Sequence, residues 1–427
     1  MSGRLRASPS GPLHGVAQVP GDKSTSHRAL ILGALAEGET RIAGLLESED
    51  VMATVRALRA FGIEVRHGEA WRVVGGEWRS PASIDCGNSG STARLLMGAA
   101  AGFALRATFT GDTSLRRRPM DRLIAPLKAM GTRIDGEEHL PLTLHGGALH
   151  GIAHVNRFAS AQLKTAVLLA GLRAEGEVEV IEPNPSRDHG EIMLGEFGCA
   201  VEVADGRVRL GRQRRLTGTT IRIGGDPSSA AFVWTAASIL PGSAVETPGV
   251  LVNPLRIGLL DALKAMGAEV VITDRQMQSG EWTGDVRVAA GPLRGIHLPA
   301  TRVPAMIDEY PLIAVAAAFA AGTSRFDGLA ELRTKESDRL AAIVAGLTAC
   351  GVAARSEGDS LIVGGGAVPG GASIGSRGDH RIAMAMLTLG LAAERPVTVD
   401  GAEMIATSFP VFAEVMRSIG AEIDELE

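Results

Sequence analysis

Short polar clusters precede segments that are apolar on nearly every side at six places along the chain. Segments 29–36, 92–101 and 382–391 are examples; they are rich in Ala, Leu and Val, which favours buried helices. The first N–H groups of such a helix, and the positive end of its dipole, are available to an anion at the polar cluster. Six such clusters therefore predict a site for a strongly negative ligand. The clusters are 21–28, 88–91, 160–162, 226–229, 308–310 and 379–381.

A second pattern has the same period. Apolar residues at helical spacing, such as Leu340, Ile343, Leu347 and Cys350, lead to a glycine and then to a short segment of strand character. Glycine is expected there because it adopts the left-handed conformation that ends a helix. These glycines recur at intervals of 67 to 84 residues, which predicts six stacked repeats of helix and strand. They are Gly62, Gly131, Gly198, Gly267, Gly351 and Gly420.

The length of 427 residues exceeds what one ordinary core contains and suits two lobes of three repeats each. Two similar Gly/Pro junctions, at 19–22 and 224–227, are the expected crossings between the lobes. The predicted division is 21–225 for the first lobe and 226–427 for the second.

Composition excludes several classes of protein. The net charge of −5 provides no basic field for nucleic acid or for an acidic membrane. Cys86, Cys199 and Cys350 lie far apart and form no CxxC motif, so we expect neither a disulfide nor a metal site. Segment 1–10 lacks the apolar core of a signal peptide, and no apolar run suits a membrane span. A cytoplasmic protein is expected.

Lys23, Ser24 and Arg28 open the first buried helix, an arrangement suited to phosphate. The alternative is a capped helix with two solvated cations. Arg118 precedes Pro119, a favoured first helical residue, so its side chain is expected to have a defined direction.

Segments 160–162 and 186–191 carry weaker signals. Asp188 and Glu191 fit a capping box, which by itself explains both residues. Arg187 is then left without a structural role.

Asp308 and the segment 335–339 suggest acid–base chemistry. A carboxylate base and an acid, placed among cations that bind substrate anions, would need these residue types. Asp308 could instead be only an N-cap, and Lys335 with Arg339 could be only a solvated face. Asp379 is expected to cap the sixth buried helix. His380 and Arg381 are then expected to point toward the group that lies at the N-terminal end of this helix.

Five motifs, in order along the whole chain, resemble the 5-enolpyruvylshikimate-3-phosphate (EPSP) synthase family of enolpyruvyl transferases. The resemblance implies an α/β fold: a two-lobed inside-out α/β barrel of six βαβαββ repeats, three per lobe, with residues 1–20 joined to the second lobe. The motifs are 21–28, 87–91, 118–120, 332–339 and 379–381.

The resemblance also implies the reaction. The enolpyruvyl group of phosphoenolpyruvate would pass to the 5-hydroxyl of shikimate 3-phosphate, releasing phosphate on the pathway toward chorismate. A monomer without cofactor or metal is implied, its lobes closing around the two substrates without nucleic acid or membrane as partner.

Residue roles follow from the same resemblance. Asp308 would be the base at the 5-hydroxyl, Glu336 the proton donor and acceptor at C3, and Lys335 would assist both. The first lobe would mainly bind shikimate 3-phosphate, and the second would supply the catalytic carboxylates and bind phosphoenolpyruvate. Shikimate 3-phosphate would contact Ser24, Arg28, Ser160, Ala161, Gln162 and Arg187. Asp308 and Lys335 would bind substrate in addition to their catalytic roles. Phosphoenolpyruvate would contact Lys23, which also has a catalytic role, and Asn88, Gly90, Arg118, Gln162, Arg339, His380 and Arg381.

The chain departs from the common pattern of the family at two positions. Thr407 stands where some members carry Lys, and Arg187 stands where others carry Ser. Both features are similar to a divergent bacterial subgroup, whose glyphosate-tolerant members carry Ala where this chain has Gly90. Glyphosate occupies the phosphoenolpyruvate pocket in this family, so Gly90 predicts sensitivity.

Three other functions fit the sequence less well. UDP-N-acetylglucosamine enolpyruvyl transferase shares the fold, but it usually carries a reactive Cys before its Arg-Pro, and segment 111–118 here has none. A DNA clamp would need basic helices lining a hole, whereas these helices are apolar. An inactive phosphometabolite-binding relative would have no need of Asp308 and Glu336.

Overall fold

A computed structural model describes residues 3–426 of the chain. The chain divides into two compact units, each with its own hydrophobic core. The boundary lies between Ile223 and Gly224 rather than after Gly225, and the turn Met277–Glu281 belongs to the unit formed by the earlier part of the chain. Unit 1 comprises Met1–Pro20, Gly224–Gln276 and Trp282–Glu427, and unit 2 comprises Gly21–Ile223 and Met277–Glu281.

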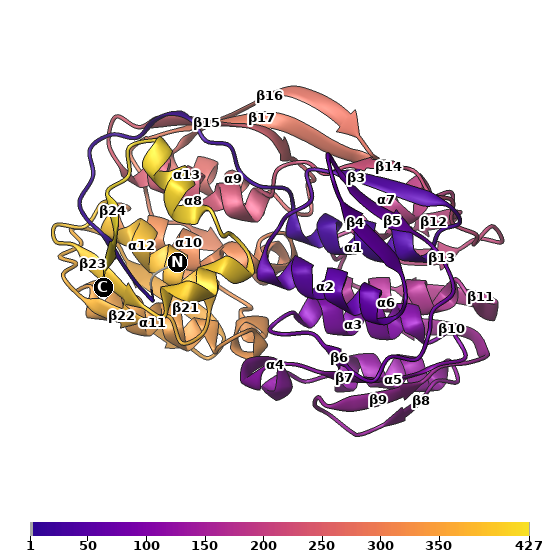
Figure 1. The fold of residues 1–427 in the computed structure, drawn as a ribbon. Helices are drawn as coiled ribbons and strands as arrows, with labels where there is room; N and C mark the ends of the chain where they lie inside the picture. The colour runs from indigo at the N-terminus through magenta and orange to yellow at the C-terminus, as the bar shows by residue number, and fades with distance from the viewer. Residues whose placement is uncertain (1–2, 427) are drawn as a thin grey trace. The chain divides into compact units, whose positions relative to one another are not determined.

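Unit 2 has three four-stranded sheets within the described residues, with strand orders β14-β3-β5-β4, β6-β7-β9-β8 and β10-β11-β13-β12 (Figure 1). The first two strands of each sheet are parallel and the other neighbours are antiparallel. The strands are β3 (Glu39–Ala43), β4 (Glu64–His67), β5 (Trp71–Val74), β6 (Ile84–Asp85), β7 (Arg106–Thr110), β8 (Arg133–Asp135), β9 (Leu142–His145), β10 (Leu149–Val155), β11 (Ala174–Ile181), β12 (Val201–Ala204), β13 (Arg207–Leu210) and β14 (Thr220–Arg222). The helices are α1 (Lys23–Leu35), α2 (Glu49–Ala60), α3 (Gly90–Ala100), α4 (Thr113–Arg117), α5 (Asp121–Ala129), α6 (Ala161–Gly171) and α7 (His189–Glu196).

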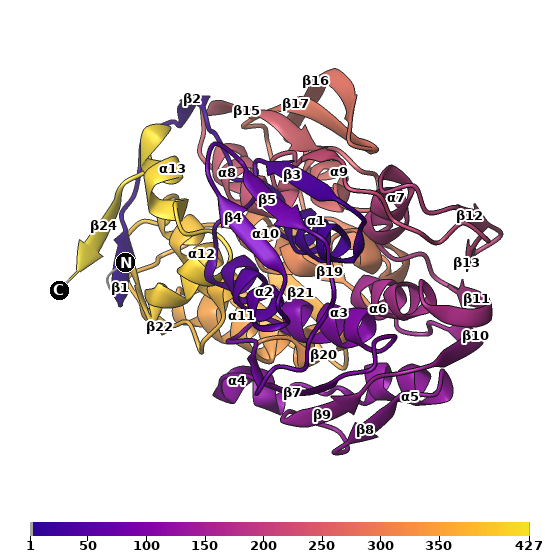
Figure 2. The ribbon, with the colours of Figure 1, turned by 45° about the vertical axis from the view of Figure 1, so that its right-hand side comes forward.

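Unit 1 also has three four-stranded sheets among the residues described, with orders β16-β17-β15-β2, β18-β19-β21-β20 and β22-β23-β1-β24. Strand β1 lies between β23 and β24, so the first and last strands of the chain are neighbours (Figure 2). The strands are β1 (Arg4–Ala7), β2 (His14–Val16), β15 (Ala244–Leu251), β16 (Glu269–Gln278), β17 (Glu281–Ala289), β18 (His297–Leu298), β19 (Thr323–Phe326), β20 (Ala353–Glu357), β21 (Ser360–Gly364), β22 (Ser373–Gly375), β23 (Val397–Asp400) and β24 (Ile423–Leu426). The α-helices are α8 (Pro227–Ile239), α9 (Gly258–Met266), α10 (Tyr310–Ala318), α11 (Arg339–Ala349), α12 (His380–Gly390) and α13 (Phe412–Ser418), and the 3₁₀ helices are η1 (Ala300–Ala305), η2 (Ile307–Glu309), η3 (Ala330–Thr334) and η4 (Ala402–Thr407).

The repeat has the order strand, helix, strand, helix, strand, strand, as in β6-α3-β7-α5-β8-β9. A parallel strand pair needs a crossover connection, and in four of the repeats a buried helix (α3, α6, α10 or α12) provides it. Strand β14 supplies the first strand of the repeat that contains α1, and β1 and β2 complete two repeats of unit 1. The predicted α/β fold of six repeats is confirmed.

Helices α1, α3, α6, α8, α10 and α12 are the predicted apolar helices, and nearly all of their residues are buried. Five of them begin after a side-chain cap in the predicted polar cluster, such as Asp22, Ser89 or Asp379. Helix α10 differs, because it follows η2 and its N-cap residue, Glu309, makes no side-chain cap hydrogen bond. The glycines predicted to end the other helix of each repeat all have a left-handed φ, between 83° and 118°.

Candidate active site

The start of α1 carries Lys23 and Arg28. The Asp22 carboxylate accepts the N–H of Thr25 at 2.7 Å and caps the helix. Lys23 Nζ lies 3.0 Å from Asp50 Oδ2 on α2, so its ammonium group has a defined place rather than a free, solvated one.

Arg28 connects the first turns of α1 and α6. Its guanidinium donates to the carbonyl of Ser24 at 3.0 Å, to Thr165 Oγ1 at 2.9 Å and to the carbonyl of Ala161 at 3.4 Å. The residue is only 4 % exposed, which contradicts the alternative of a solvated cation. Two clusters predicted to bind the same phosphorylated substrate are therefore in contact.

Arg118 and Asn88 form a second pair, at the start of α3. Arg118 Nη2 donates to Asn88 Oδ1 at 2.6 Å and to Ser114 Oγ at 3.2 Å. The prediction that Pro119 is the first helical residue is wrong, because α5 begins two residues later, after Met120 as N-cap. The direction of Arg118 comes instead from its place directly after α4, where its side chain turns back to Ser114.

Gln162 lies beside a cation that sequence reasoning missed. Its Nε2 donates to Ser91 Oγ at 2.8 Å, and its Oε1 accepts from Arg94 Nη1 at 3.0 Å. Arg94 also donates to the carbonyl of Pro119 at 3.2 Å. Gly90, one turn earlier on α3, faces the Arg94 guanidinium. A single arginine in an otherwise apolar buried helix was the signal that could have identified Arg94.

Ser160 and Arg187 lie in two loops of unit 2. The Ser160 hydroxyl accepts the N–H of Leu163 at 3.3 Å and caps α6. Arg187 lies between β11 and α7. The capping box predicted there is wrong: the Asp188 side chain makes no cap hydrogen bond, and Glu191 forms a buried ion pair with Lys164 instead.

In unit 1, one buried arginine connects three carboxylates. Arg339 is 1 % exposed; its Nη1 lies 3.1 Å from Asp308 Oδ1 and its Nη2 lies 2.5 Å from Glu336 Oε2. Its Nε donates to Asp379 Oδ2 at 2.8 Å. Burial lowers the pKa of the Arg339 guanidinium, but the three carboxylates outweigh burial and keep that pKa above its ordinary value. Asp308, the predicted base, and Glu336, the predicted acid, therefore both form ion pairs with the permanently charged side chain of Arg339.

Two more cations approach Asp308. Lys335 Nζ lies 3.8 Å and Arg381 Nε 4.0 Å from Asp308 Oδ1, and Arg381 also donates to the Asp308 carbonyl at 3.3 Å. Asp308 lies in η2 and is not the N-cap of α10, so the capping alternative is wrong. The alternative of a solvated face fails for Arg339, which is buried.

His380 is the first residue of α12, after the Asp379 cap. Its Nδ1 lies 3.1 Å from Thr407 Oγ1, and that hydroxyl donates to the carbonyl of Met404 at 2.7 Å. Because the hydroxyl has only one hydrogen, it can accept an N–H from His380 Nδ1. Thr407, which stands where some family members carry Lys, thus orients His380 in this chain.

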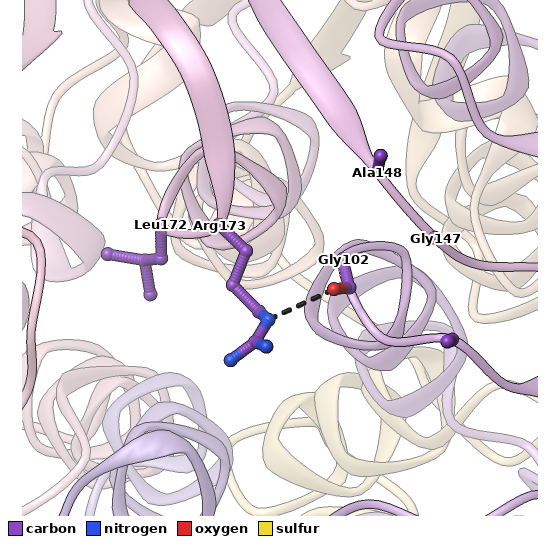
Figure 3. A pocket seen from close by; sticks show the side chains of 6 residues that line it. Gly102, Gly147, Ala148, Leu172 and Arg173 are labelled. Carbon is purple, nitrogen blue, oxygen red and sulfur yellow. Dashed lines mark hydrogen bonds between the residues drawn. The ribbon is translucent and has the colours of Figure 1, made fainter.

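A pocket of about 460 Å³ lies elsewhere in unit 2, at the C-terminal ends of α3 and α6 (Figure 3). Arg173 lines it and donates to the carbonyl of Gly102 at 3.0 Å. Gly90 and Gln162 lie at the opposite, N-terminal ends of the same helices. Helix C-termini repel anions, so this pocket does not suit the predicted ligands.

Within residues 3–426, no group of three His, Cys, Asp or Glu side chains could bind a metal ion. In the same part of the chain, no helix has the length and apolar character needed to cross a membrane.

Comparison with known proteins identifies the family. The sequence profile of EPSP synthase (3-phosphoshikimate 1-carboxyvinyltransferase) matches residues 7–416. The 3-phosphoshikimate 1-carboxyvinyltransferase of Caulobacter vibrioides is 52% identical, with 99% of each chain covered. The chain belongs to the EPSP synthase family. A Phenylobacterium zucineum relative of the same name is 54% identical, covering 98% of this chain and 95% of its own.

Solved structures agree with this family assignment. An EPSP synthase structure from Acinetobacter baumannii superposes with a TM-score of 0.87 at 39% identity, covering 99% of both chains. The enolpyruvyl transferase NikO from Streptomyces tendae, at 17% identity and a TM-score of 0.78, shares the fold, with 99% of this chain and 98% of its own covered. The EPSP synthase fold therefore extends beyond close relatives.

Proposed function

We propose that the residues described above carry out the reaction of this chain, which is a 3-phosphoshikimate 1-carboxyvinyltransferase. The enzyme uses phosphoenolpyruvate and shikimate 3-phosphate in aromatic amino acid biosynthesis. The observation that carries the assignment of roles is Arg339, whose guanidinium contacts both Asp308 and Glu336. A buried arginine fixes the direction of two carboxylates that must act on neighbouring atoms.

In the proposed mechanism Glu336, as the acid, protonates C3 of phosphoenolpyruvate, which makes C2 electrophilic. Asp308 accepts the proton of the 5-hydroxyl of shikimate 3-phosphate while the oxygen attacks C2. The tetrahedral intermediate then loses a C3 proton to Glu336 and expels phosphate. Lys335 and Arg381, beside Asp308, stabilise negative charge near the reacting hydroxyl.

The cations provide the binding energy. Two phosphate groups carry about −1.5 to −2 charges each, and each substrate adds a carboxylate. In unit 2, Ser24, Arg28, Ser160, Ala161, Gln162 and Arg187 bind shikimate 3-phosphate, while Lys23, Asn88, Gly90, Arg118 and Gln162 bind phosphoenolpyruvate. In unit 1, Arg339, His380 and Arg381 bind phosphoenolpyruvate. Arg94 joins this set because it contacts Gln162 and faces Gly90.

Phosphate release tests the proposal. With phosphoenolpyruvate present, wild type should release phosphate when shikimate 3-phosphate is the acceptor and not when UDP-N-acetylglucosamine is. Arg339→Lys should lower turnover strongly, because a lysine cannot contact both carboxylates and Asp379 at once. Release with the nucleotide sugar, or full activity of Arg339→Lys, would contradict the proposal.

We also infer that the enzyme acts as a monomer in the cytoplasm. Each described sheet is completed by strands of the same chain, and Cys86, Cys199 and Cys350 are buried free thiols, as in reducing compartments. Sedimentation at assay concentration should give a mass near 44.3 kDa. A species of twice that mass would contradict the inference.

A further inference from the structure

Lys164 is a buried cation on α6 that is two residues from Gln162 and has no part in the mechanism above. It is 1 % exposed, and its Nζ lies 2.7 Å from Glu182 Oε2 and 2.6 Å from Glu191 Oε1. Both glutamates are also buried. Buried charges are costly, and replacing them by apolar residues is often stabilising, so a buried pair is weak evidence for a role in stability. Its other contacts indicate a different role.

Glu182 begins the loop that carries Arg187, and both Glu182 and Lys164 are hydrogen-bonded to Ser186 in that loop. The Ser186 hydroxyl donates to Glu182 Oε1 at 2.6 Å, and the Ser186 N–H lies 3.4 Å from Glu182 Oε2. Lys164 Nζ donates to the Ser186 carbonyl at 3.4 Å. The hydroxyl, N–H and carbonyl of the residue directly before Arg187 are therefore all bonded to this pair.

The same carboxylate reaches the second loop through Asn156. Asn156 Nδ2 donates to Glu182 Oε1 at 2.8 Å and to the Ser160 carbonyl at 3.1 Å, while its Oδ1 accepts the Ser160 N–H at 3.3 Å. These bonds stabilise a turn in which Ala159 has a φ of 48°, a conformation that costs free energy for a residue other than glycine. Glu182 thus contacts both loops that carry the proposed ligands of shikimate 3-phosphate.

Glu191 differs from Glu182. Burial raises the pKa of Glu191, although Lys164 opposes that rise. Its Oε2 has no hydrogen-bond partner among the described residues, whereas both oxygens of Glu182 are hydrogen-bonded. Glu182 is therefore the carboxylate that joins Lys164 to the loops.

We propose that Glu182 and Lys164 are positioning residues for shikimate 3-phosphate, which keep the Ser160 and Arg187 loops in their binding geometry without contacting the substrate. The inference rests on the proposed function, because it assumes that Ser160 and Arg187 bind that substrate. A merely structural pair would affect thermal stability and leave the KM for shikimate 3-phosphate unchanged.

The test compares Glu182→Gln and Ser186→Ala with a control variant on β11, the strand that directly precedes their loop. Glu182→Gln should raise the KM for shikimate 3-phosphate about 10- to 100-fold, as expected when hydrogen bonds to a charged group are lost. Ser186→Ala, which removes one hydroxyl, should raise it about threefold to tenfold. The KM for phosphoenolpyruvate and the kcat at saturating shikimate 3-phosphate should stay within about threefold of wild type, because the acid–base residues are untouched.

Glu179→Gln is the matched control. Glu179 lies on β11, is mostly buried and pairs with Arg207 and Arg209 at 2.9 Å, but neither partner belongs to the two loops. This variant should leave the KM for shikimate 3-phosphate unchanged, whatever its melting temperature.

Arg187→Ala separates failure of the inference from failure of the proposed function. A raised KM for shikimate 3-phosphate in Arg187→Ala, with an unchanged KM in both Glu182→Gln and Ser186→Ala, would overturn the positioning role alone. An unchanged KM in Arg187→Ala would instead overturn the assignment of that loop to the substrate. If Glu182→Gln does not fold, Ser186→Ala decides, since it leaves the buried ion pair intact.

Discussion

Replacing Gly90 by alanine would add one methyl group beside the proposed phosphoenolpyruvate ligands. The φ of Gly90 is an ordinary one for a helix, so the backbone tolerates a side chain. The added Cβ would lie 2.6 Å from Arg94 Nη1 and 3.5 Å from Arg118 Nη1. The second distance is an ordinary contact, whereas the first requires the flexible Arg94 guanidinium to move.

The size of this movement determines how much the inhibition constant for glyphosate should rise. Relief to an ordinary contact of 3.4 Å displaces Arg94 Nη1 by 0.8 Å (3.4 minus 2.6), and its bond to Gln162 Oε1 is 3.0 Å long. The displacement breaks or weakens that bond, and a hydrogen bond to a charged group contributes about 1.5–3 kcal/mol, or about 10- to 100-fold in affinity. We expect a glyphosate inhibition constant raised by about that factor. The KM for phosphoenolpyruvate should rise less, because the shorter substrate meets the methyl less directly.

The assay is phosphate release at saturating shikimate 3-phosphate, with phosphoenolpyruvate and glyphosate varied. Gly195→Ala is the control, since Gly195 lies within α7 and a Cβ there would meet nothing within 4 Å. Gly195→Ala should melt no lower than wild type, because alanine favours helices by up to about 1 kcal/mol over glycine. Gly90→Ala should melt lower than Gly195→Ala, because the displaced Arg94 weakens its bond to Gln162. A wild type that is already tolerant, with no further change in Gly90→Ala, would refute the reasoning.

Three other predictions concern individual buried side chains. Thr407→Val removes the hydroxyl beside His380 and should raise the KM for phosphoenolpyruvate about fivefold, as expected for one hydrogen bond; an unchanged KM in steady-state kinetics would contradict the orienting role. Burial lowers the pKa of His27 well below its ordinary value, so below about pH 6.5 only the unfolded chain binds a proton at this histidine. The free energy of unfolding should therefore fall by up to about 1.4 kcal/mol per pH unit on acidification. Denaturant unfolding at several pH values should show a weaker pH dependence for His27→Gln, and equal slopes would count against this. Burial raises the pKa of Cys199 and of Cys350 to about 11, so iodoacetamide at neutral pH should modify these thiols only after unfolding, as mass spectrometry can show; rapid native modification would contradict their burial.

The repeat was predictable from sequence because each of its signals is local. The glycine after a helix, as at Gly267, and the cap before an apolar helix, as at Ser89, depend on a few neighbouring residues. The assignment of Met277–Glu281 to unit 2 was not predictable, because it depends on packing between distant segments such as Gly280 and Ile192. No local pattern encodes such a contact.

The site was predictable only in part. Motifs identified Asp308, Glu336 and Arg339, but the ion pairs between them depend on how three segments of unit 1 pack. Arg94 was missed because its helix was predicted to be apolar on nearly every side. Glu191 was misassigned because a capping box needs only sequence spacing, whereas the buried Lys164 that binds it lies on another helix.

The central claim is that Asp308 and Glu336 transfer protons and are not needed to bind shikimate 3-phosphate. The most direct measurement is turnover of Asp308→Asn and Glu336→Gln, combined with calorimetric titration of each variant with shikimate 3-phosphate. Turnover should fall by about 10²- to 10⁴-fold in each, with the dissociation constant close to that of wild type. Near-normal turnover in both variants would contradict the assigned roles.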